Sequence, residues 1–90
     1  ENLFMYYMGG EFLETPAGDG STAWYNEITD YTYSVIGSPE NANVIIGHYT
    51  QMIWSTTTEV GIAKARSASG KEYVVARYSP PGNVGGQYPY

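Results

Sequence analysis

His48, the single histidine of the chain, and two glutamates are the residues whose type and position favour chemistry at a site. On a helical projection His48 lies at the edge of an apolar stripe, and Glu27 occupies the matching edge of an earlier helix. Glu1, at the start of the first predicted strand, is a third candidate. A carboxylate beside an imidazole can orient the ring, raise its pKa or share a divalent cation with it. The sequence leaves open whether the three residues converge, and the alternative is a structural His48 with Glu27 in an ion pair.

Other catalytic chemistry finds less support in the sequence. There is no Gly-rich phosphate loop followed by lysine, no HExxH, no GxSxG and no cysteine. The net charge of -5 repels phosphate backbones, so nucleic acid is not an expected partner. An anionic membrane surface is disfavoured for the same reason, whereas a neutral lipid or sterol in an apolar pocket is compatible with this charge.

The first half of the chain predicts a strand, a loop and a helix. Residues 1–8 are apolar on both alternating faces, which predicts a strand buried on both sides. Proline, glycine and aspartate predict a loop over residues 15–20. Trp24 and Ile28 recur at helical spacing, which predicts an amphipathic helix over residues 21–31.

The second half predicts a loop, a short helix and a β-hairpin. Glycine, serine, proline and asparagine predict a long loop over residues 34–44, and apolar spacing predicts a helix over residues 45–54. Two strand-like segments, residues 59–66 and 71–78, are joined by a turn of small residues and should pair antiparallel. Residues 83–90 form an aromatic and glycine-rich tail without periodicity. The class is therefore α+β, with helices packed on an antiparallel sheet in a single domain.

Four short motifs occur in a fixed order along the chain. Residues 47–54 read Gly-His-Tyr-Thr-Gln-Met-Ile-Trp, and residues 78–83 read Tyr-Ser-Pro-Pro-Gly-Asn. Residues 24–27 read Trp-Tyr-Asn-Glu, and residues 1–3 read Glu-Asn-Leu. Together they resemble the signatures of the CAP superfamily, which comprises cysteine-rich secretory proteins, antigen 5 and pathogenesis-related 1 proteins and is also called the SCP domain. The resemblance covers nearly the whole chain.

The resemblance implies an α-β-α sandwich with a three-stranded antiparallel sheet between helical layers. Residues 1–90 would be the C-terminal portion of one such domain, without its N-terminal helices, and we expect them to expose apolar surface. In the family, Glu1, Glu27 and His48 would line one cleft, where a further histidine completes a site for zinc or another divalent cation. That histidine has no counterpart here, and the three residues are the candidate metal ligands and catalytic residues that the resemblance implies.

A binding module is the function that the resemblance implies, in a secreted or membrane-associated role in defence or signalling. Family members bind sterols, fatty acids or phospholipids in apolar crevices, and others act through protein partners; a homodimer is a further expectation. The aromatic side chains expected at a ligand are Tyr31, Tyr33 and Tyr49. One alternative is a metal-assisted hydrolase or protease that uses the cleft residues. Another is a structural polar cleft, with function carried by variable loops.

The lack of cysteine bears on the compartment. Secreted relatives carry disulfides near the last two strands, where this chain has Ile62 and Ala76. In this respect the chain resembles the Golgi-associated plant pathogenesis-related branch, which faces the cytosol and is attached to membranes. The broader family favours an extracellular location, and the sequence contains no apolar run long enough to span a bilayer.

Overall fold

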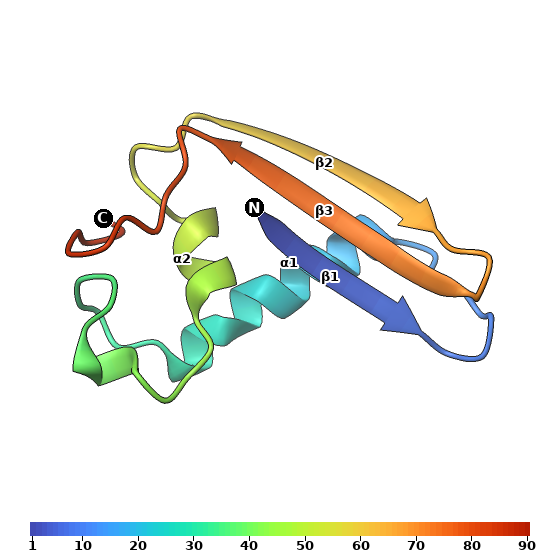
Figure 1. Ribbon diagram of the computed structural model, residues 1–90, viewed down its shortest axis with the longest axis horizontal. Coiled ribbons are helices and arrows are strands. Elements are labelled where there is room, and N and C mark those ends of the chain that lie inside the picture. Colours follow the sequence, from blue (N-terminus) through green and yellow to red (C-terminus); the bar gives the residue numbers. More distant parts are fainter.

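A three-stranded antiparallel sheet is the framework on which the helices pack (Figure 1). The computed structural model describes residues 1–90, with strands β1 (Asn2–Tyr7), β2 (Glu59–Arg66) and β3 (Lys71–Ser79). The strand order is β1-β3-β2, so β3 is the central strand. β2 and β3 form the predicted hairpin, and their register places Ile62 opposite Ala76. The α+β class and the three-stranded antiparallel sheet are confirmed.

Strand β1 is buried on one face only, and the prediction of two buried faces is wrong. Leu3, Met5 and Tyr7 are 53%, 49% and 54% exposed, whereas Asn2 is buried and Phe4 packs against the core. The helices all lie on one side of the sheet in Figure 1, so the opposite side has no cover in this chain. The expected exposed apolar surface is found there.

Helix α1 (Pro16–Tyr25) begins where the sequence predicts a loop, and that prediction is wrong. Pro16 stands in the first turn, where its missing N–H costs no hydrogen bond, and Asp19 favours the same positive helix end. Gly20 lowers the helix propensity, but a Cβ there would lie 3.2 Å from the Cβ of Phe4. The glycine therefore permits close packing of α1 on β1, and this packing outweighs propensity.

The remaining helices are shorter or tighter than predicted. α1 continues directly into a 3₁₀-helix, η1 (Asn26–Asp30), whose three residues per turn rotate Ile28 away from the core to 39% exposure. A 3₁₀ turn, η2 (Pro39–Asn41), interrupts the predicted long loop. α2 (Gly47–Met52) begins two residues later than predicted, so Ile45 is 76% exposed instead of buried.

The apolar core lies between α1 and the sheet. Trp24, Val74 and Ala76 are buried, and Phe4 and Met52 are among the side chains packed around them. The indole N–H of Trp24 donates to the carbonyl of Leu3 at 3.3 Å, which satisfies its polar atom within this core. Trp24 thereby fixes the position of α1 relative to β1, and with it the start of η1.

An ion pair between the buried Glu72 and the exposed Arg66 lies at the other end of the sheet. Glu72 is 1% exposed and accepts hydrogen bonds from the Arg66 guanidinium at 2.8 Å and from the backbone N–H of Leu13 at 3.2 Å. The hydrogen bond from Arg66 lowers the pKa of Glu72 despite its burial. The guanidinium carbon also lies 4.2 Å from the centre of the Phe12 ring. These contacts tie the segment between β1 and α1 to the hairpin.

Candidate functional site

Glu27 and His48 are in direct contact. The imidazole Nδ1 of His48 lies 2.7 Å from one carboxylate oxygen of Glu27, and the backbone N–H of Tyr49 donates to the other oxygen at 3.0 Å. Glu27 therefore joins η1 to the first turn of α2, where exposed N–H groups favour a negative charge. The two side chains are 15% and 34% exposed, so the pair opens partly to solvent.

Two further residues, Trp24 and Asn2, hold His48 in place. The sequence does not predict this role for either of them. The Trp24 ring is stacked on the imidazole, with centroids 6.2 Å apart and planes 12° from parallel. The buried Asn2 side chain donates to the His48 carbonyl and to the Tyr78 hydroxyl, both at 3.1 Å. An asparagine within an otherwise apolar strand was the available signal, because asparagine is a poor strand former.

Glu1 does not join this pair. Successive side chains of a strand point to opposite faces, so Glu1 points away from the helices if Asn2 points toward them. Its carboxylate is 64% exposed and lies 3.7 Å from the guanidinium of Arg77. The three predicted site residues are therefore split between the two sides of the sheet.

The donor set does not fit a zinc site within this chain. No group of three or more histidine, cysteine, aspartate or glutamate side chains is placed to hold a metal ion. Glu27 and His48 together supply only two ligating residues, and each Glu27 oxygen already accepts or shares one hydrogen bond, with His48 and with the Tyr49 N–H. Zinc sites in proteins use four protein ligands when structural and three when catalytic. The pair is better suited to fixing α2 against η1 than to metal chemistry.

The two longest motifs lock together through side chains. The Asn83 amide oxygen accepts a hydrogen bond from the Thr50 hydroxyl at 2.6 Å, and its nitrogen donates to the Gly47 carbonyl at 2.8 Å. The Gln51 side chain accepts from the backbone N–H of Gly82 at 2.9 Å. These contacts attach the segment after β3 to α2 and bring the two motifs together in the fold.

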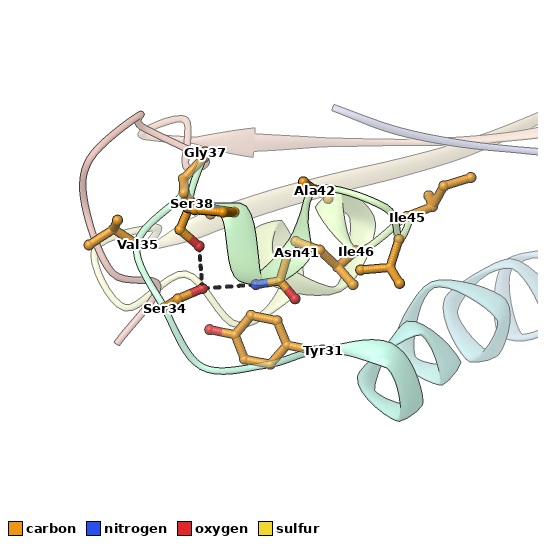
Figure 2. Close-up of a pocket in the computed structure, with 13 residues that line it drawn as sticks. Tyr31, Ser34, Val35, Gly37, Ser38, Asn41, Ala42, Ile45 and Ile46 are labelled. Atoms are coloured by element: carbon orange, nitrogen blue, oxygen red, sulfur yellow. Dashed lines mark hydrogen bonds between the residues drawn. The ribbon is translucent and has the colours of Figure 1, made fainter.

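A pocket of about 460 Å³ lies within residues 31–47, in the segment between η1 and α2 (Figure 2). Val35, Ile36 and Ile46 are among its seven apolar lining residues. Its polar lining includes a small network in which the Ser34 hydroxyl accepts from the Ser38 hydroxyl at 2.7 Å and from the Asn41 amide at 2.9 Å. The pocket is therefore amphipathic, with an ordered polar edge.

Tyr31 lines this pocket, and it alone of the three predicted ligand tyrosines does so. Its hydroxyl oxygen is buried without a hydrogen-bond partner, and burial raises the pKa of Tyr31. Tyr49 is 5% exposed and packs between Tyr31 and Tyr25, with ring centroids 5.3 and 5.9 Å away. The Tyr33 ring instead packs against the rings of Tyr88 and Tyr90. The ligand roles of these residues remain predictions.

The comparison with protein families gives one match over most of the chain. The sequence profile of the family described as "CAP: Cysteine-rich secretory protein family" matches residues 6–78. This range includes Glu27, His48 and the whole loop pocket. None of the helices of the structure has the length and apolarity needed to cross a membrane.

Individual relatives agree with this match. Pathogenesis-related protein 1 of Arabidopsis thaliana is 36% identical over 90% of this chain and 51% of its own length. Golgi-associated plant pathogenesis-related protein 1 of Homo sapiens is 41% identical over 68% of this chain and 37% of its own length. A solved structure, described as NaASP2 with Zn2+, superposes with a TM-score of 0.82 and 30% identity over 99% of this chain and 47% of that chain. The chain spans about half or less of these relatives.

Proposed function

The chain belongs to the CAP family of cysteine-rich secretory proteins, and from that premise we propose that it is a binding module for a neutral lipid of the sterol class. The observation that carries this proposal is the pocket within residues 31–47, hereafter the loop pocket. Its volume of about 460 Å³ falls in the range of small-molecule sites, about 300–1,000 Å³. Seven of its thirteen lining residues are apolar, which suits a ring system or acyl chain.

The charge of the loop pocket selects a neutral ligand over an anionic one. Its lining contains no lysine, arginine or histidine, and Asp30 and Glu40 lie next to lining residues in the sequence. A fatty-acid carboxylate or a lipid phosphate would enter without a counter-charge, which is costly.

The setting we propose for this activity is extracellular or at the Golgi, as the names of the relatives suggest for those proteins. Defence or signalling is the corresponding biological role. A metal-assisted hydrolase at Glu27 and His48 finds no support in the donor set of this chain.

Filling the loop pocket is the direct test. Ala42 lines the pocket and is exposed, so Ala42→Trp should block it without disturbing the core. Ala68, exposed in the hairpin turn at the far end of the sheet, provides the matched control Ala68→Trp. We expect saturable binding of dehydroergosterol, a fluorescent sterol, to the parent chain and to Ala68→Trp, and at least about tenfold weaker binding to Ala42→Trp. Equal affinity in the two variants would refute the assignment of the pocket.

A further inference from the structure

We infer that the C-terminal tail, residues 84–90, is a clasp that positions one wall of the loop pocket, so that ligand affinity depends on the tail. The inference rests on the proposed function for its effect on binding, but its structural part stands on contacts that are independent of any ligand. No residue of the tail lines the pocket itself.

Ile36 is the point at which the tail holds the pocket wall. Ile36 is one of the residues that line the pocket, and both of its backbone groups are bonded to the tail. The Ile36 N–H donates to the Gln87 carbonyl at 2.9 Å, and the Gly86 N–H donates to the Ile36 carbonyl at 3.0 Å. Ile36 has no other backbone hydrogen bond, so releasing the tail frees both groups at once.

Aromatic packing reinforces these two bonds. The Tyr33 ring lies on Tyr88 and Tyr90, with centroids 4.9 and 5.0 Å away, and its hydroxyl donates to the Tyr90 carbonyl at 2.5 Å. Stacked pairs and hydrogen bonds of this kind each contribute modestly, but here they act on the same short segment. Tyr33 is thus a positioning residue, acting on the pocket through the tail.

The tail is anchored on both sides of this contact. Asn83, directly before it, is bonded to Thr50 and Gly47 of α2. Near its other end Pro89 is buried, and the Pro89 carbonyl accepts a hydrogen bond from the Ser55 N–H at 2.8 Å. The segment between these anchors is held across the loop.

Another part of the pocket is held by hydrogen bonds within the loop itself. The Asn41 side chain accepts from the Thr32 N–H at 2.9 Å, donates to the Thr32 carbonyl at 2.7 Å and donates to the Ser34 hydroxyl. These bonds lie within the loop and do not involve the tail. Release of the tail should therefore free the Ile36 backbone and leave the bonds that join Asn41 to Thr32 and Ser34 in place.

Tyr33→Ala tests the clasp. Tyr7→Ala is the control, because the two residues are 51% and 54% exposed and Tyr7 is the last residue of β1, whose end lies far from the loop in Figure 1. We expect Tyr33→Ala to weaken dehydroergosterol binding about tenfold and to speed amide exchange at Ile36 and Gly86. Tyr33→Phe keeps both ring contacts and loses only the hydroxyl, so its affinity should remain within about threefold of the parent chain. Tyr7→Ala should change neither readout.

The sterol affinities and the exchange rates test the clasp and the proposed function separately. Parent-like sterol affinity in Tyr33→Ala overturns the clasp, and so does unchanged exchange at Ile36 and Gly86. If the parent chain binds no sterol, the proposed function fails, and the exchange rates alone then decide whether the tail positions Ile36. If Tyr33→Ala does not fold, Tyr88→Ala removes one stacked ring from the tail and should weaken binding about threefold.

Discussion

Replacing Glu27 measures what the Glu27–His48 pair does. Glu27→Ala removes an acceptor from the His48 imidazole and another from the Tyr49 N–H, and hydrogen bonds to charged groups contribute about 1.5–3 kcal/mol each. Water can reach the His48 side chain, which is 34% exposed, and recover part of the first bond. We therefore expect a loss of about 2–4 kcal/mol in the free energy of unfolding. Glu27→Gln keeps one acceptor for Tyr49 and should lose about 1–2 kcal/mol.

Urea denaturation at pH 7 gives these values, with Glu40→Gln as an exposed control that should stay within about 0.5 kcal/mol of the parent chain. Dehydroergosterol affinity measured on folded Glu27→Gln should stay within about twofold, because Glu27 does not line the loop pocket. A stability loss below about 0.5 kcal/mol for Glu27→Ala, or lost binding with unchanged stability, would refute the structural role of the pair.

Two further predictions concern the stability of the fold. A Cβ at Gly82 would lie 2.6 Å from the Trp54 ring, so Gly82→Ala should lower the free energy of unfolding, measured by urea denaturation, by about 1–3 kcal/mol. The control Gly61→Ala should leave it unchanged, because a Cβ at Gly61 meets nothing within 4 Å. Equal stabilities of the two variants would contradict the close packing at Gly82. The pKa of Glu72 is lowered mainly by the hydrogen bond from Arg66, so the unfolded chain binds more protons below the ordinary value of 4.5. The stability that ionised Glu72 contributes is therefore present above that pH and is lost as the pH falls through the folded-state pKa. Thermal unfolding from pH 6 to 3 should show a shallower acid decline for Glu72→Gln than for the parent chain, and a parallel decline would contradict this account.

The hairpin and the motif order could be predicted because their signals are local. Turn residues between two β-rich segments predict β2 and β3 to within one residue. The start of α1 could not be predicted, because Gly20 is selected by contact with Phe4 and not by helix propensity. The alternating apolar pattern of β1 could not show that one of its faces is exposed. Whether a strand face is buried depends on which elements pack on that side of the sheet, and not on the strand's own residues.

The candidate site, too, could be predicted from the sequence only in part. The helical projection correctly favours an inward position for Glu27, but the switch from α1 to η1 and the strand alternation at Glu1 are needed to show which residues meet. The loop pocket and its tail leave only weak sequence signals. Tyr33 and Tyr88 are 55 positions apart in the chain by number, and nothing in periodicity joins them.

The central claim is that the loop pocket is the ligand site, and mapping a bound sterol onto the backbone amides tests it most directly. In a titration of the isotope-labelled chain with dehydroergosterol, we expect NMR shift changes to concentrate in residues 31–47 and at Gly86 and Gln87 of the tail. Shifts confined to the exposed sheet face around Leu3 and Met5, or to the surroundings of His48, would contradict the claim.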